Sequence, residues 1–120
     1  MGIGVDVVDL ARFERATTRT PALLPRLFAE SERTDAGRPL PLRSLAGRFA
    51  AKEALIKALG ESTGVGWHDM RVISGPERKP AFELSGAAAA IARRLGAGTM
   101  HLSMSHDAGI AIAYVVVEAA

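Results

Sequence analysis

The sequence predicts a single-domain α+β fold, in which a mostly antiparallel sheet packs against one long central helix and several short helices. Three observations support this prediction. A β-branched run, Ile3 to Asp9, opens the chain, a segment rich in strong helix formers spans 47–60, and two pairs of apolar runs joined by short turns fill the second half. Strands that return through short turns pair as hairpins, and hairpins segregated from helices are typical of α+β proteins.

Length and composition limit the classes of function. The 120 residues suffice for one core, and no linker or repeat divides them. The absence of Cys excludes disulfides, thiolate nucleophiles and cysteine-ligated metals. Because no apolar run approaches the ~20 residues of a transmembrane helix and no signal peptide is recognisable, we expect a cytoplasmic protein with no membrane partner. The net charge of +2, with one Trp and one Tyr, argues against a nucleic-acid partner.

The first expected strand carries an acid in its interior. Alternation along 3–9 places Asp6 on the same face as Gly4 and Val8. A carboxylate among apolar residues is costly to bury unless it meets a cation, so Asp6 is a candidate for function. The alternative is that Asp6 ends the strand at a solvated turn. Asp9 instead suits the N-cap of the helix that follows.

The remaining elements follow from propensity and turn signals. Expected helices cover 10–16 and 23–28, then a loop rich in Gly and Pro spans 35–43, and the central helix runs from an N-cap at Ser44 to a glycine cap at Gly60. Expected strands cover 70–74 and 81–84, then 100–105 and 110–118, with a helix after Ser85 between the two pairs. A turn at 106–109 joins the last two strands.

The central helix carries its charges in unusual places. At about 100° per residue, Glu53 and Lys57 share one arc beside Phe49, whereas Arg48 and Lys52 lie far around the cylinder among leucines. Small or apolar residues fill most of the rest, so we expect the helix to be mostly buried and its charges to need partners. The alternative is an exposed i,i+4 ion pair between Glu53 and Lys57, which would add little stability.

Carboxylates from three regions suggest a metal site. Asp6, Glu53 and the pair His106-Asp107 are polar groups that local structure does not explain well. Oxygen ligands without Cys favour Mg²⁺, which in proteins is commonly completed by water and substrate phosphates. With Lys57 one turn beyond Glu53, the set suits a pyrophosphate held by a metal and an ammonium, as in metal-assisted phosphoryl transfer.

Three motifs carry a resemblance to a known family. In chain order they are GIGVD at 2–6, GRFAAKEA at 47–54 followed by Lys57, and LSMSH at 102–106. On these motifs the chain resembles the holo-acyl-carrier-protein synthases, the short-chain type of 4'-phosphopantetheinyl transferase, over the whole of 1–120. Such enzymes move the phosphopantetheine arm of coenzyme A to a serine hydroxyl of an acyl carrier protein and release adenosine 3',5'-bisphosphate, in fatty acid and lipid biosynthesis and also in polyketide synthesis.

The resemblance implies roles for particular residues. Asp6 and Glu53 would hold Mg²⁺ against the coenzyme A pyrophosphate, and Lys57 would neutralise charge on the phosphates as the leaving group departs. A water held by the metal or by Glu53 could take the serine proton. Arg48 and His106 match positions near bound coenzyme A, and His106 is also a candidate general base.

The resemblance also implies partners. The first helix docks the carrier, and Arg12 and Arg19 fall at its basic positions, which suits an acidic carrier. Family members are typically homotrimers with sites shared between neighbouring subunits. Asp107, at a position where family sequences vary, is a candidate third metal ligand or merely a cap of the turn. The alternative function is a non-catalytic trimeric module that docks acidic carrier domains, against which the intact metal and lysine positions argue.

Overall fold

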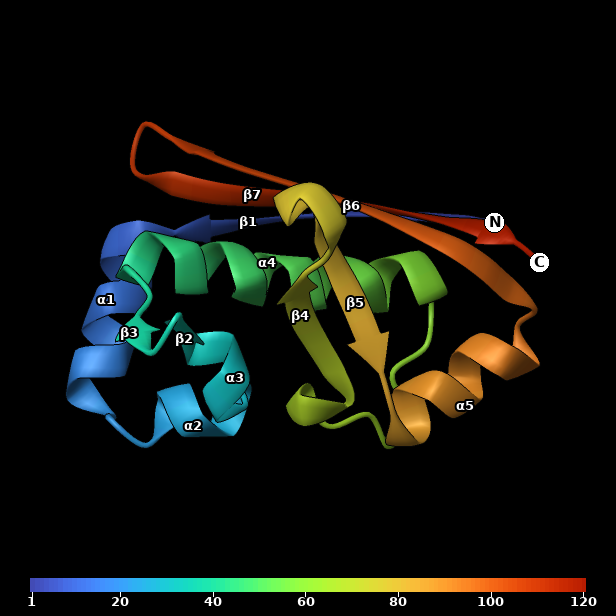
Figure 1. Ribbon diagram of the computed structural model, residues 1–120, viewed down its shortest axis with the longest axis horizontal. Helices are drawn as coiled ribbons and strands as arrows, with labels where there is room; N and C mark the ends of the chain where they lie inside the picture. Colours follow the sequence, from blue (N-terminus) through green and yellow to red (C-terminus); the bar gives the residue numbers. More distant parts are fainter.

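A three-stranded sheet lies along one side of the longest helix, α4, in the computed structural model, which describes residues 1–120 (Figure 1). The helices α1 to α3 gather at one end of α4, and the hairpin β4–β5 and helix α5 lie toward the other end. The elements are β1 (Gly2–Asp9), α1 (Leu10–Arg19), α2 (Leu23–Leu27), α3 (Glu30–Arg33), β2 (Thr34–Asp35), β3 (Arg38–Pro39), α4 (Leu42–Leu59), η1 (Trp67–Asp69), β4 (Met70–Ser74), η2 (Pro76–Arg78), β5 (Pro80–Leu84), α5 (Gly86–Arg94), β6 (Ala97–Asp107) and β7 (Ile110–Ala119).

The main sheet is antiparallel, as expected, with the strand order β1-β7-β6. Its central strand, β7, buries Ala111, Ala113 and Val115 completely on the face toward α4. Asp6 of β1 and Met104 of β6 both lie opposite Ala113, so they share this inner face. The first and last strands of the chain therefore cover α4 together. None of the helices is long and apolar enough to cross a membrane.

The helix α4 sits unusually close to β1. A Cβ atom on Gly4 would lie 1.9 Å from the carbonyl oxygen of Ala54, and one on Gly2 would lie 2.0 Å from that of Ala58. Real Cβ atoms do not approach other atoms so closely, so only glycine allows the strand backbone to rest on the helix backbone. This contact fixes how β1 side chains face the side chains of α4.

Two sequence-based boundaries are wrong in informative ways. The helix α4 begins at Leu42, directly after an N-cap at Pro41, so Ser44 lies in the first turn and makes no cap. The strand β6 continues to Asp107, and only Ala108 and Gly109, with φ values of 50° and 78°, form the turn. Such a two-residue turn matches the twist of a hairpin. The expected loop at 35–43 also contains the short pairing of β2 with β3.

Replacing Gly4 with Ala should therefore destabilise the fold by about 2 kcal/mol, the usual cost of forcing an atom into a closely packed site. The matched control is Gly47→Ala, because Gly47 is interior to α4 and its nearest foreign atom would be Met104 Sδ at 3.8 Å. Gly47→Ala should be neutral or stabilising by up to about 1 kcal/mol. Urea unfolding midpoints measure both effects, and equal midpoints for the two variants would refute the close contact.

Candidate active site

An ion pair joins β1 to α4 on the inner face of the sheet. The Lys57 ammonium donates to Asp6 Oδ1 at 2.9 Å and to the Val5 carbonyl oxygen at 3.0 Å. The Lys57 side chain is 54% exposed and that of Asp6 is 19% exposed, so the pair lies at the rim of the fold. The i,i+4 pairing of Lys57 with Glu53 that the sequence allowed is not formed, because Lys57 pairs with the strand instead.

The neighbouring carboxylate, Glu53, has no partner. It lies one turn before Lys57 on α4, half-buried, and takes part in none of the five ion pairs of the structure. Burial raises the pKa of Glu53, the negative charge of Asp6 raises it further, and Lys57 opposes both effects. Two carboxylates thus face the same space, and the unpaired one is held in an environment that favours a cation or a proton.

This pair of carboxylates fits a divalent cation with oxygen ligands. No cluster of three or more His, Asp or Glu side chains forms in the chain, so Asp6 and Glu53 are the whole donor set here. Mg²⁺ commonly binds through one or two carboxylates and completes its shell with water and substrate phosphates. The donor set therefore suits Mg²⁺ with a phosphate-bearing substrate better than a fully protein-ligated metal.

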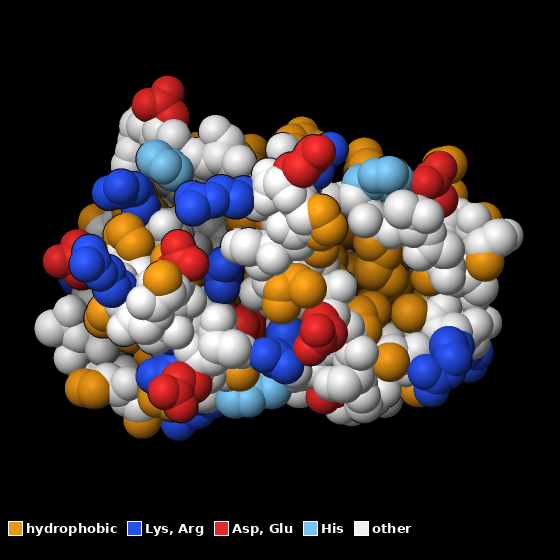
Figure 2. Space-filling model, viewed as in Figure 1, with side chains coloured by type: hydrophobic (Ala, Val, Ile, Leu, Met, Phe, Trp, Pro, Cys, Tyr) orange, Lys and Arg blue, Asp and Glu red, His pale blue; other side chains and the backbone are white.

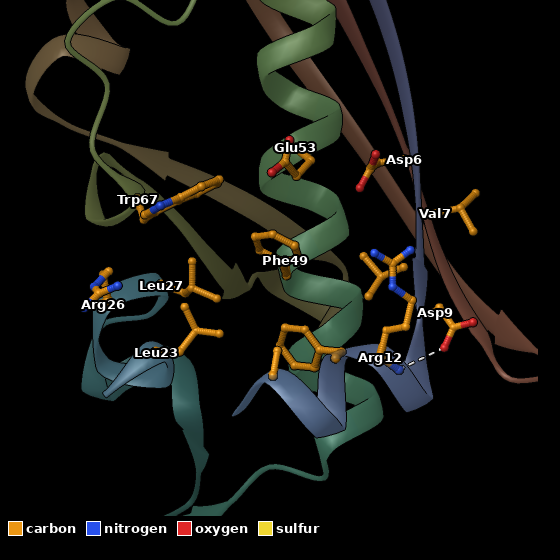
Figure 3. Close-up of a pocket in the computed structure, with 13 residues that line it drawn as sticks. Asp6, Val7, Asp9, Arg12, Leu23, Arg26, Leu27, Phe49, Glu53 and Trp67 are labelled. Atoms are coloured by element: carbon orange, nitrogen blue, oxygen red, sulfur yellow. Dashed lines mark hydrogen bonds between the residues drawn. The ribbon is translucent and has the colours of Figure 1, made fainter. Parts of the chain in front are cut away.

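A pocket of about 670 Å³ opens beside these carboxylates, and we call it the carboxylate pocket (Figure 3). Asp6 and Glu53 lie at one end of it, in the upper part of the view, and Arg12 reaches from α1 toward the Asp6 side. Arg26 lines the pocket from α2. The pocket therefore combines three acids, Asp6, Asp9 and Glu53, with two arginines that come from separate helices.

Apolar side chains form the rest of the carboxylate pocket. The rings of Phe13 and Phe49 stack with their centroids 5.7 Å apart, and the Trp67 ring lies 5.5 Å from Phe49. Leu23 and Leu27 of α2 complete this apolar side. A polar end that suits phosphate and metal thus adjoins a preformed apolar compartment, which is the usual composition of a ligand site.

A second, smaller pocket of about 220 Å³ lies between the start of α4 and the end of β6. It brings together Arg48 and His106, with Arg43 and Ser44 beside them, and we call it the arginine pocket. The Arg48 Nη1 donates to the Glu32 carbonyl oxygen at 2.8 Å. Burial lowers the pKa of Arg48, while the carboxylates of Glu32 and Asp35 oppose that shift. Two guanidinium groups and an imidazole make this pocket suited to an anion.

The two pockets lie at opposite edges of the sheet. Asp6 is on β1 and His106 is on β6, with β7 between them. Within one chain, His106 therefore does not approach Glu53. The structure brings Arg48 together with His106 and brings Asp6 together with Glu53 and Lys57, but it keeps these two groups apart.

Asp107 does not join the carboxylates as a third ligand within the chain. It pairs with Ile110 at the tip of the hairpin and points to the outer face of the sheet, opposite to the face of Asp6. Its Oδ1 accepts a hydrogen bond from the Ala108 amide at 2.9 Å. Within the chain, Asp107 is kept away from Asp6 and Glu53 because the strand continues through residue 107, and it caps the turn.

The helix α1 carries the two arginines that the sequence singled out. Asp9 Oδ1 accepts from the Arg12 amide at 2.9 Å, which confirms Asp9 as the N-cap (Figure 3). Arg12 lines the carboxylate pocket, and Arg19 lies exposed in the last turn of α1. Two residues of the carboxylate pocket, Arg26 and Trp67, were not predicted from the sequence. The solitary Trp beside a glycine-rich loop was the one signal that could have indicated Trp67.

Comparison with known proteins places this site in a family context. A family model described as the 4'-phosphopantetheinyl transferase superfamily matches residues 2–115. A holo-[acyl-carrier-protein] synthase of Leifsonia xyli subsp. xyli is 61% identical over 117 residues, which are 98% of this chain and 95% of that relative.

Two solved structures share the fold at full length. The ACPS–CoA complex of Chronobacterium ammoniagenes has a TM-score of 0.86 at 29% identity and covers 99% of this chain and 97% of its own. The holo-[acyl-carrier-protein] synthase of Helicobacter pylori in complex with coenzyme A has a TM-score of 0.76 at 34% identity, covering 97% of this chain and 99% of its own.

Proposed function

The chain belongs to the 4'-phosphopantetheinyl transferase superfamily as a holo-acyl-carrier-protein synthase, and on this basis we propose how its site works. It transfers the 4'-phosphopantetheine arm of coenzyme A to a serine hydroxyl of an apo-acyl carrier protein and releases adenosine 3',5'-bisphosphate. The coenzyme A complexes of two structural relatives support coenzyme A as the donor of the phosphopantetheine arm. The holo-carriers made in this way serve fatty acid and lipid biosynthesis, in which acyl chains are carried on the phosphopantetheine thiol.

The observation on which this proposal chiefly rests is the unpaired, half-buried Glu53 beside the Asp6–Lys57 ion pair. A cluster of two acids and one ammonium matches what a pyrophosphate with a divalent cation requires. Asp6 and Glu53 would hold Mg²⁺, which would neutralise the pyrophosphate and polarise the phosphorus–oxygen bond that breaks.

The residues of the chain supply the remaining chemistry. The serine oxygen forms a bond to the phosphorus that carries pantetheine, and the bond from that phosphorus to the bridging oxygen breaks, so the oxygen leaves with the nucleotide. Lys57, exposed enough to reach the substrate, donates to the phosphate oxygens that gain charge. A water held by Glu53 can take the serine proton while it passes one of its own protons to the Glu53 carboxylate.

The arginine pocket would bind the nucleotide end of coenzyme A. Arg43 and Arg48 offer guanidinium forks to phosphate, and His106 adds a ring nitrogen. Because this pocket lies across the sheet from Glu53, a single coenzyme A would reach both sites only where two chains meet. His106 then contributes to the site of a neighbouring subunit.

An exposed apolar sheet face supports such an assembly. The outer face of β1 and β7 presents Ile3, Val5, Val7 and Tyr114, which are 67%, 38%, 52% and 50% exposed. Val5 and Tyr114 lie directly opposite each other in the ladder. A continuous apolar face of this kind is typical of a subunit interface, and we propose a homotrimer with its active sites between subunits.

The surface around α1 would dock the carrier. Arg12 borders the carboxylate pocket, and Arg19 extends the positive surface along the same helix. In Figure 2 the Lys and Arg side chains are most numerous over the end of the molecule that carries α1 to α3. An acidic carrier would be steered to this end and oriented with its serine toward Glu53.

The central test is transfer by the purified chain. With Mg²⁺, coenzyme A and an apo-acyl carrier protein, intact-mass spectrometry should show the carrier gaining one phosphopantetheine group. Glu53→Gln should lower kcat at least about 100-fold, because it removes both a metal ligand and a proton acceptor. Glu61→Gln, which removes a remote exposed acid, should leave kcat unchanged.

Failure of every apo carrier in a panel to gain mass would refute the transferase. If coenzyme A and carrier still bound in calorimetry, the non-catalytic docking module would be the correct function. Normal activity of Glu53→Gln would refute only the catalytic role assigned to Glu53, and the transferase function would stand.

Docking through α1 predicts a charge-dependent carrier affinity. Arg19→Glu should raise KM for the carrier about tenfold while KM for coenzyme A stays constant, and added salt should shrink the difference. Arg93→Glu on α5 is the matched control, because Arg93 is also exposed but α5 lies at the other end of the molecule. Equal carrier KM values for the two variants would exclude α1 as the docking element.

Assembly through the outer sheet face predicts a trimer in solution. Light scattering should give three times the chain mass for the native protein, and Val5→Glu should reduce it because a charge would be buried in the interface. Leu95→Glu, which adds the same charge at a site 47% exposed outside that face, should leave the trimer intact. A native chain that is monomeric at micromolar concentration would contradict this assembly.

A further inference from the structure

A second ion pair, between Lys52 of α4 and Glu32 of α3, is completely buried and takes no part in the chemistry described so far. Lys52 directly precedes Glu53 in sequence but points to another side of the helix, and both it and Glu32 are 0% exposed. The Lys52 ammonium donates to Glu32 Oε1 at 2.9 Å. Burying two charges is costly, so such a pair needs an explanation beyond stability.

Every donor and acceptor of this pair is used. The ammonium also donates to the carbonyl oxygens of Leu27 at 2.7 Å and Trp67 at 3.0 Å, so its three protons have three acceptors. The Glu32 carboxylate accepts from the amides of Ala29 and Val72, one on each oxygen. Because all of these hydrogen bonds are formed, a movement of the segments that the network joins would break at least one of them.

The backbone groups bound by Lys52 belong to residues that line the carboxylate pocket. Leu27 ends α2 and Trp67 begins η1, and both side chains face the pocket. We call Leu23, Leu27 and Trp67 the α2–η1 wall. Lys52 thus ties both halves of the wall to the helix that carries Glu53.

A second bond holds the same wall from the outside. The His68 Nε2 lies 2.8 Å from the Pro25 carbonyl oxygen, and since a carbonyl only accepts, this nitrogen is the donor. His68 is in η1 and Pro25 is in α2. One buried ammonium and one exposed imidazole therefore fasten α2 against η1 at two points.

We propose that Lys52 and His68 are positioning residues that hold the α2–η1 wall in place for the incoming carrier protein. The inference rests on the proposed function. The wall stands beside Arg26 and faces α1 across the pocket, on the side to which the carrier docks. The nucleotide end of coenzyme A goes to the arginine pocket at the other sheet edge. Loosening the wall should therefore weaken carrier binding more than coenzyme A binding.

The cleanest test uses His68, because its loss leaves the core intact. His68→Ala should raise KM for the carrier about fivefold, the effect of one neutral hydrogen bond, with kcat and KM for coenzyme A within about twofold of the native values. His68→Gln, whose amide can still donate to the Pro25 carbonyl, should restore the native KM. Glu61→Gln, which removes an exposed ion pair with Arg94 far from the pocket, is the control for nonspecific effects.

The buried bond is tested by the double change Lys52→Met with Glu32→Gln, which removes both charges at once. If this variant folds, its carrier KM should rise about tenfold or more, since several hydrogen bonds to the wall are lost. The single tryptophan of the chain, Trp67, reports the wall directly, and acrylamide should quench its fluorescence more strongly in both the His68→Ala and the double variant.

The outcomes separate the two proposals. A native chain that transfers phosphopantetheine, together with a His68→Ala variant of native carrier KM and native Trp67 quenching, would overturn the positioning role alone. A parallel rise of both KM values in His68→Ala would also overturn it, because general loosening does not discriminate between substrates. If the double variant does not fold, His68→Ala and its Gln rescue decide the matter.

Discussion

The backbone contact between β1 and α4 is the constraint on which the rest of the structure depends. Gly2 and Gly4 leave no space for a Cβ atom against the carbonyl oxygens of Ala58 and Ala54. Because strand and helix touch through their backbones, the side chains beside the contact cannot slide past one another. Asp6 is thereby held against Lys57 and near Glu53. The packing surface of alanine and glycine residues thus positions the acidic side chains of the site.

The same helix must then distribute its charges to different neighbours. Residues three and four apart share a face, so Glu53 and Lys57 face β1, whereas Lys52 turns toward α2, α3 and η1. Arg48 lies one turn before Lys52 and donates to the carbonyl of Glu32, so it stands between the buried network and the arginine pocket. Small residues elsewhere on α4 let it serve three sets of partners at once.

Features that depend on neighbouring residues could be predicted from the sequence, whereas contacts between residues far apart in the chain could not. The strand alternation that turned Asp6 inward, the cap at Asp9 and the two charged arcs of α4 are local properties, and the structure has each of them. The partner of Lys52 lies 20 residues away in a short helix that has no distinctive pattern, so only the fold reveals it. The orientation of Asp107 is also a local property, because the strand runs on through residue 107 and its alternation turns His106 inward and Asp107 outward.

Lys52 and Glu53 are adjacent in the sequence, but Lys52 stabilises the fold whereas Glu53 is the residue to which we assign the chemistry. A buried charge that serves the fold must satisfy all its hydrogen bonds, as Lys52 does with three acceptors. Glu53 is left without a partner, and its pKa is raised by burial and by a second acid. A single apolar or amide side chain would relieve the cost of burying this carboxylate, and so would the divalent cation that we propose for the site. The half-buried charge that has no partner on this helix is therefore the one to which we assign the chemistry.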